Sequence, residues 1–306
     1  MQTAKQIATT MNMRKDIPAD TETATDNVMK IINLIENTEG QSGCAFAHGL
    51  SFYVETQKHK LLMDLGPSAE TIENAKALGI DLSQVDTVIL SHGHYDHSGG
   101  IIPFTQVNDK AVIYMQESAV DDYYSDDGIM AQPRFRYIGI DKDIALLPQV
   151  RFLDGDTVID DELELFVIRK RSHELPSTNK SLLVRNGDEY QRDDFGHEHF
   201  LVIHQDGMSV LMSGCAHNGI LSILSAFKEK YGKAPDMVVS GFHLMKKTDY
   251  TDAEIKEIEA IANELKDYPT RFVTCHCTGI PAFDLMKNIM GDKLEYVHSG
   301  ETVYLS

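Results

Sequence analysis

A buried strand that runs directly into a cluster of metal-binding side chains is the strongest constraint on how this chain can fold. Residues 85–90, Val-Asp-Thr-Val-Ile-Leu, are mostly apolar towards their end, as expected of an interior strand covered on both faces. The sequence Ser-His-Gly-His-Tyr-Asp-His-Ser-Gly-Gly follows at once, at positions 91–100. Loops beyond the carboxyl end of such strands commonly bind ligands in α/β proteins. The segment therefore predicts an α/β fold with a site at a sheet edge.

Four side chains in this loop can bind metal: His92, His94, Asp96 and His97. Histidine accounts for 13 of the 306 residues, so three within six positions are not explained by composition. Imidazole and carboxylate donors suit Zn(II), Mn(II) or Fe(II). We therefore expect a metal centre, with Zn(II) as the first candidate.

The rest of the chain alternates strand and helix patterns without a break in composition. Thr251 and Glu254 predict a capping box ahead of a helix, and Asp206-Gly207 predicts a hairpin turn. Residues 121–128 are predicted to be an acidic loop, and residues 295–305 have strand character. We expect a single domain over 28–306, preceded by an N-terminal extension, 1–27, whose polar composition favours disorder.

Composition narrows the class of protein. The formal net charge of −19 argues against extended nucleic-acid binding, which needs a basic surface, but allows a small-molecule substrate. No apolar run approaches the ~20 residues that cross a bilayer, and the N-terminus lacks the apolar segment of a secretory signal. Four cysteines do not make a disulfide scaffold in a chain of this length. We expect a cytoplasmic protein; its oligomeric state is not indicated.

The pattern His-x-His-x-Asp-His, with Ser before it and Ser-Gly-Gly after it, resembles the signature of the metallo-β-lactamase superfamily. Residues 61–66, Leu-Leu-Met-Asp-Leu-Gly, resemble the strand of that superfamily that ends in Asp-x-Gly. The resemblance implies a four-layer αββα sandwich and two divalent metal ions. It also implies that His92 and His94 bind one ion, and that Asp96 and His97 bind the other.

Later residues must complete two metal shells. Residues 212–217, Met-Ser-Gly-Cys-Ala-His, resemble the superfamily's strand ending in Gly-Asp, whose aspartate bridges the metals; Cys215 stands in its position and His217 follows. Residues 274–279, Thr-Cys-His-Cys-Thr-Gly, resemble the segment with the last ligand histidine, which implies His276. Cys215 is expected either as a ligand or as a small buried residue behind the site. Strand alternation predicts that Cys275 and Cys277 face away from the metals if His276 faces them.

Other histidines carry weaker signals. His243 ends a strand pattern and is expected in the active site, as a metal or substrate ligand or a general acid; the alternative is a buried core histidine. His173 lies in a predicted loop before Glu-Leu-Pro and is a candidate for the pocket, as a ligand or behind one. His197 and His199 surround Glu198, where we favour a polar loop over a separate metal site.

The segments Ser-Gly-Cys-Ala-His-Asn-Gly-Ile, Gly-Phe-His-Leu and Cys-His-Cys-Thr-Gly, with Glu-Asn-Thr at 36–38, resemble the dihydropteroate-synthase-like branch of the superfamily over about residues 28–306. Archaeal members of that branch make 7,8-dihydropterin-6-methyl-4-(β-D-ribofuranosyl)aminobenzene 5′-phosphate.

We favour a hydrolase of a small phosphorylated or ester substrate that acts through metal-activated water. Asp96 would position the water, and His243 or His217 would protonate the leaving group. The alternatives are a transferase joining a pterin methylene diphosphate to an aminobenzene ribotide, and a non-catalytic or redox metal-binding protein. Basic residues that could reach a phosphate, or remain solvated, are Arg169, Lys170, Arg171, Lys180, Lys246 and Lys247.

Overall fold

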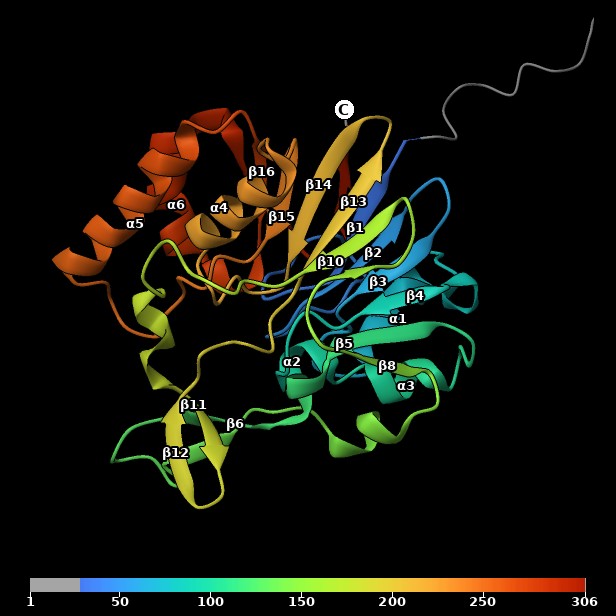
Figure 1. Cartoon of the computed structure of the whole chain (residues 1–306), viewed down its shortest axis with the longest axis horizontal. Helices are drawn as coiled ribbons and strands as arrows, with labels where there is room; N and C mark the ends of the chain where they lie inside the picture. Colours follow the sequence, from blue (N-terminus) through green and yellow to red (C-terminus); the bar gives the residue numbers. More distant parts are fainter. Residues whose placement is uncertain (1–27, 306) are drawn as a thin grey trace, which may run out of the picture.

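The computed structural model of the chain describes residues 28–305 (Figure 1). The predicted N-terminal extension, 1–27, lies outside the described residues. Among the helices of residues 28–305, none has the length and apolar character required to pass through a bilayer.

Two seven-stranded sheets form the centre of the fold. The first has the order β18-β1-β2-β3-β4-β5-β8, with strands at Thr302–Tyr304, Lys30–Ile35, Ser51–Glu55, Lys60–Met63, Thr87–Ile89, Val112–Gln116 and Val150–Leu153. The second has the order β17-β16-β15-β14-β13-β10-β9, with strands at Leu294–Tyr296, Arg271–Thr274, Met237–Ser240, Met208–Ser213, Phe200–Gln205, Leu163–Phe166 and Thr157–Val158. The C-terminal segment thus gives one strand to each sheet.

The alternation of side chains along these strands produces the four-layer sandwich that the sequence predicts. Ile31 and Phe52 of the first sheet share a core with Val210 and Val239 of the second. The other face of the second sheet packs on three helices, and the other face of the first sheet packs on two shorter ones (Figure 1). These helices are α4 (Ile220–Tyr231), α5 (Asp252–Lys266) and α6 (Ile280–Met290), and α1 (Glu70–Ala77) and α3 (Ile101–Thr105).

Local sequence signals set several element boundaries. The Thr251 side chain accepts a hydrogen bond from the Glu254 backbone, and the Glu254 side chain bonds the Thr251 backbone, which completes the predicted capping box of α5. Asp206 and Gly207 have φ values of 53° and 79°, as a two-residue hairpin turn between β13 and β14 requires.

A third, four-stranded antiparallel sheet lies below the two large sheets in Figure 1. Its order is β12-β11-β6-β7, with strands at Glu189–Arg192, Leu182–Asn186, Asp122–Asp126 and Phe135–Tyr137. The predicted acidic loop at 121–128 is therefore wrong over most of its length. Tyr124 in β6 packs edge-on against Tyr137 and Tyr190, with ring centroids 5.3 and 5.1 Å away, and this aromatic packing gives an acidic segment a reason to pair as a strand.

Parallel pairing brings the predicted site residues to one end of the sandwich. Strand β4 lies between β3 and β5, parallel to both, and β15 lies between β14 and β16 in the same way. The carboxyl ends of parallel neighbours meet at one edge of a sheet. The loops after β4, β14, β15 and β16 carry His92, Cys215, His243 and His276, respectively.

Candidate metal centre

Three histidines form the first group of candidate ligands. Ring nitrogens of His92, His94 and His217 all lie within 4.8 Å of one another. The Nε2 atoms of His92 and His217 are 3.3 Å apart. All three side chains are buried, although His217 follows a different strand from the other two.

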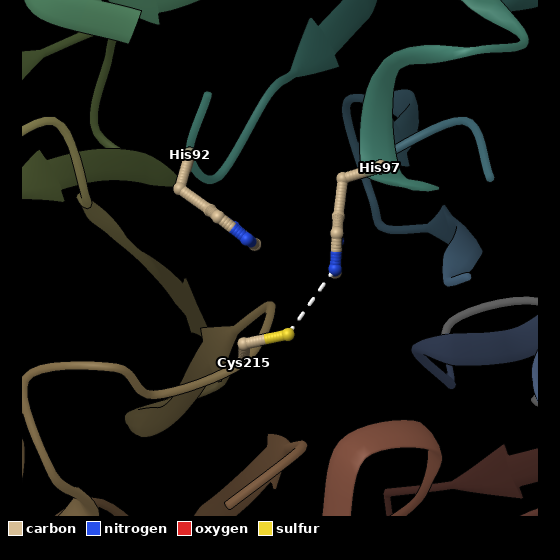
Figure 2. Close-up of side chains that lie close together, drawn as sticks. All are labelled: His92, His97 and Cys215. Atoms are coloured by element: carbon tan, nitrogen blue, oxygen red, sulfur yellow. Dashed lines mark hydrogen bonds between the residues drawn. The ribbon is translucent and has the colours of Figure 1, made fainter. Parts of the chain in front are cut away.

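Asp96, His97 and His276 form the second group. Asp96 Oδ2 lies 3.8 Å from His97 Nε2 and 3.6 Å from His276 Nε2. Cys215 lies between the two groups, with its Sγ atom 3.2 Å from His97 Nε2, and Figure 2 shows His92, His97 and Cys215 converging on one space. Cys215, His92 and His97 also have their ligand atoms within 4.8 Å of one another. Cys215 therefore faces the site rather than lying behind it.

Hydrogen bonds at Nδ1 fix the tautomers of His92 and His217. Asn179 Nδ2 donates to the His217 carbonyl (2.7 Å), so its Oδ1 is left to accept from His217 Nδ1 (3.0 Å). Ser91 Oγ donates to Asp64 Oδ2 (2.7 Å), and so accepts from His92 Nδ1 (2.8 Å). Each neutral ring therefore carries its proton on Nδ1 and turns an Nε2 lone pair towards the other ring. Two lone pairs at this separation repel one another unless a cation lies between them.

Hydrogen bonds at Nδ1 also orient the two histidines of the second group. His97 Nδ1 donates to Asp64 Oδ2 (2.7 Å), and His276 Nδ1 donates to Asn37 Oδ1 (2.7 Å). The Nε2 atoms of His276 and His94 are buried without a hydrogen-bond partner among residues 28–305. A buried imidazole nitrogen without a partner costs free energy that a bound cation would recover. The donor set thus fits divalent metal.

Burial and charge set the protonation of these histidines. Burial first, and then the neighbouring imidazoles, hold the pKa values well below 6.5 for four of them: His92, His94, His217 and His276. These rings stay neutral, which is the form that binds metal. Burial also lowers the pKa of His97, but the Asp64 and Asp96 carboxylates outweigh it and raise that pKa to about 9.

Buried side chains of the segment 193–199 hold both ligand loops. The Glu198 carboxylate accepts hydrogen bonds from the backbone N–H groups of His217 and Asn218, each at 2.8 Å. His197 Nδ1 accepts from the Gly93 N–H (2.9 Å), and its Nε2 donates to Asp193 Oδ2 (3.0 Å). With both ring nitrogens engaged, His197 supports the loop of His92 and His94. Its neighbours in sequence give no sign of this contact, which joins segments 104 residues apart.

Several residues with a strained backbone lie at the candidate centre. Asp64, Ala216, His243 and His276 have φ values of 61°, 52°, 49° and 49°. Residues other than glycine rarely adopt this left-handed region, because it costs ~1–3 kcal/mol for each of them. Residues strained in this way cluster at functional sites. Three of the four lie in loops that follow strands β14, β15 and β16.

A cavity of about 490 Å³ opens onto both groups. Its volume falls in the range of small-molecule pockets, ~300–1,000 Å³. One part of its lining consists of candidate ligands, and another comes from the third sheet through Ser125, Arg136 and Leu182. Lys247 also lines the cavity, and His48 does so with its Nε2 3.4 Å from Asp96 Oδ2. His48 and Arg136 carry no spacing signal in the sequence, so only their placement in space identifies them.

His243 and His173, the two weaker candidates, lie in different parts of the structure. His243 lines the cavity, with its ring centroid 4.1 Å from that of His217 and its Nδ1 atom without a hydrogen-bond partner among residues 28–305. His173 does not line this cavity; its Nε2 lies 3.5 Å from Glu264 Oε1 in α5. The structure therefore brings His243, but not His173, to the candidate centre.

The two cysteines beside His276 also differ. Cys275 is buried in the core between the sheets, as the alternation of a strand predicts. Cys277 instead lines the cavity, so the expectation that it faces away is wrong. Strand β16 ends at Thr274, and residues 276–278 form a 3-10 turn that begins with the positive φ of His276. Alternation no longer applies beyond that point.

Comparison with known proteins identifies relatives of this fold. A sequence profile described as the metallo-beta-lactamase superfamily matches residues 46–195. The 7,8-dihydropterin-6-methyl-4-(beta-D-ribofuranosyl)-aminobenzene-5'-phosphate synthase of Methanocaldococcus jannaschii is 26% identical, over 91% of this chain and 97% of its own. A crystal structure described as a metal-dependent hydrolase of the beta-lactamase superfamily is 30% identical, with a TM-score of 0.75 and coverage of 91% of this chain and 99% of its own. Zn(2+)-bound PqqB from Methylobacterium extorquens, 13% identical over 90% of this chain and all of its own, has a TM-score of 0.55 and shares the fold.

Proposed function

Because the chain belongs to the metallo-β-lactamase superfamily, we propose that it is a metal-dependent hydrolase of a small phosphorylated or ester substrate. One observation carries the proposal. The Nε2 lone pairs of His92 and His217 face one another at 3.3 Å, and a second set of donors lies beside them at a cavity of small-molecule size. That arrangement would hold a cation where a substrate can reach it.

Two sets of the described residues would serve as metal ligands. His92, His94 and His217 would hold one divalent ion. Asp96, His97 and His276 would hold the other, with Cys215 between the two. Zn(II) suits this mixture of nitrogen, oxygen and sulfur donors. When bound, such an ion supplies the Lewis acidity that polarises a phosphoryl or carbonyl oxygen and makes water nucleophilic near neutral pH.

The chain's own residues would perform the remaining steps. Asp96 carries a carboxylate at the cavity and would accept a hydrogen bond from the attacking water. His243 offers Nδ1 as the atom that would give a proton to the leaving group. The Lys247 ammonium and the Arg136 guanidinium line the same cavity and would attract an anionic substrate.

Metal analysis combined with a hydrolysis assay tests the proposal. We expect the purified protein to contain zinc and to cleave a chromogenic phosphodiester or thioester, and to lose both properties on chelation. His217→Ala should lose metal and activity together. His204→Ala is the matched control, because His204 lies in β13 away from the cavity. Full activity in a metal-free preparation would contradict the proposal.

A second candidate is the transferase reaction that joins a pterin methylene diphosphate to an aminobenzene ribotide. The observation favouring it is the similarity to the named archaeal synthase along 91% of this chain. The same cavity and ligand sets would then serve to bind the diphosphate leaving group. Release of diphosphate only when both co-substrates are supplied, with no hydrolysis at any metal loading, would decide for this function.

A further inference from the structure

We propose that the thiolate of Cys277 is an additional ligand of the second metal ion, beside His276 and Cys215. This inference rests on the metal centre proposed above and deepens it. It adds a second sulfur donor to a site that already includes Cys215, and so restricts which metals the protein selects.

The distances allow one ion to contact all three residues. The ligand atoms of Cys215, His276 and Cys277 lie within 4.8 Å of one another. Zinc binds sulfur at ~2.3 Å and nitrogen at ~2.0–2.1 Å in tetrahedral geometry, so the donors of one ion stand ~3.5–3.8 Å apart. Atoms within 4.8 Å of one another reach that separation with movements of about an ångström. The Cys277 side chain is 3% exposed and lines the same cavity as Asp96 and His276.

The local backbone makes room for this sulfur. A Cβ atom at Gly241 would lie 2.5 Å from Cys277 Sγ, far closer than van der Waals contact permits. Only glycine at position 241 therefore allows Cys277 to occupy its place. Gly241 belongs to the loop after β15, which also carries His243.

The same loop supplies a hydrogen bond to the sulfur. The His243 backbone N–H donates to Cys277 Sγ at 3.3 Å. A backbone donor stabilises a negatively charged sulfur, as it does in metal–thiolate centres. The contact of Cys277 Sγ with the Cys215 carbonyl, at 3.6 Å, uses only the weak S–H donor and is expendable when the proton is lost.

Cys275 provides an internal comparison. It lies two residues away and is equally buried, but it belongs to the apolar core between the sheets. A general property of buried cysteines would affect both residues alike. A metal bond would distinguish Cys277 from Cys275.

Thiolate donors have a consequence for metal choice. Soft sulfur ligands favour zinc and other thiophilic ions, whereas carboxylate and water favour Mn(II) or Mg(II). We therefore expect the second ion to be zinc in a protein offered zinc and manganese together, and Cys277→Ser to shift that preference towards manganese.

Cobalt substitution tests the bond directly. Co(II)-loaded protein should show an intense thiolate-to-cobalt charge-transfer band in the near ultraviolet. Cys277→Ser should lose about half of that intensity, since one of two thiolates is removed, whereas the control Cys275→Ser should keep all of it. A Cys277→Ser protein that keeps the full band and the full cobalt content would overturn the inference.

A second measurement uses the unaltered chain, in case a variant fails to fold. Alkylation of each cysteine, followed by peptide mass spectrometry, compares zinc-loaded with metal-free protein. Removing zinc should accelerate alkylation of Cys277 at least tenfold more than that of Cys275. Equal acceleration of the two, or none, would contradict the inference. A wild-type protein that binds no metal would overturn the proposed function itself, so the two failures can be told apart.

Discussion

The Nδ1 atom of His97 lies 2.7 Å from Oδ2 of Asp64, and both side chains are completely buried. Asp64 directly follows β3, and His97 lies in the short helix α2 (Tyr95–Ser98), so this bond joins two neighbouring strand ends. The same carboxylate accepts hydrogen bonds from the backbone and hydroxyl of Ser91, whose Oγ accepts from His92 Nδ1. One buried aspartate thus orients a ligand of each proposed metal ion.

Replacing that aspartate should weaken metal binding without removing a ligand. We expect Asp64→Asn to lower zinc affinity by ~10–100-fold, the usual effect of changing a group that orients a metal-binding histidine. Competition with a chromophoric chelator would measure it. Asp86→Asn is the matched control, because Asp86 bonds His59 Nδ1 at 2.8 Å on the surface, away from the cavity. Wild-type affinity in Asp64→Asn would show that Asp64 does not act through His97.

Glu198 should matter for stability as well as for the site. Glu198→Gln places an amide N–H₂ group against one of the backbone donors of His217 and Asn218 that the carboxylate now accepts. Breaking a buried hydrogen bond to a charged group costs ~1.5–3 kcal/mol. Urea unfolding of the metal-free protein would measure the loss. The same change at the solvent-exposed carboxylate of Glu70 should alter the free energy of unfolding by less than ~0.5 kcal/mol.

Two adjacent lysines should differ in their effect on catalysis. Lys247 lines the cavity, whereas Lys246 Nζ is held by Glu254 in α5 at 2.8 Å. We expect Lys247→Ala to raise KM for a phosphorylated substrate by about tenfold, equivalent to ~1.4 kcal/mol of binding, and Lys246→Ala to leave it unchanged. Steady-state kinetics at low salt would measure both. Equal effects of the two substitutions would show that Lys247 does not contribute to substrate binding.

The metal-free protein should be most stable near neutral pH. The pKa values of His92, His94, His217 and His276 are lowered by folding, so the unfolded chain binds more protons than the folded one once the pH falls below about 6.5. Stability is therefore lost as the pH falls below that value. His97 acts in the opposite direction: its contribution is complete below pH 6.5 and is lost as the pH rises towards its folded pKa of about 9.

Urea unfolding in the presence of a chelator, from pH 5 to pH 9, would show both slopes. The alkaline decline should be smaller in His97→Gln, and smaller also in the zinc-loaded protein, because the metal replaces the proton of His97. A free energy of unfolding that rises steadily from pH 7 to pH 5 would contradict the assignment of neutral buried histidines.

The elements that follow local patterns could be predicted from the sequence. The capping box of α5, the hairpin turn at Asp206-Gly207 and the buried strand β4 depend on residues within a few positions of one another. The acidic strand β6 was missed because β11, one of its two partners, lies far away in sequence: Ser125 of β6 pairs with Leu182 of β11. Its charge pattern resembles a loop, and only pairing and aromatic packing make it a strand.

For the site, the sequence by itself determined one loop. His92, His94, Asp96 and His97 are covalent neighbours after a single strand, so their proximity needs no knowledge of the rest of the fold. Tertiary structure decided the rest: that His217 and not His173 faces His92, that Cys277 but not Cys275 lines the cavity, and that Lys247 does so while Lys246 pairs with Glu254. The physical reason is that spacing within a loop is set by bond lengths, whereas distances between loops depend on how two sheets pack and on single backbone angles such as the φ of 49° at His276.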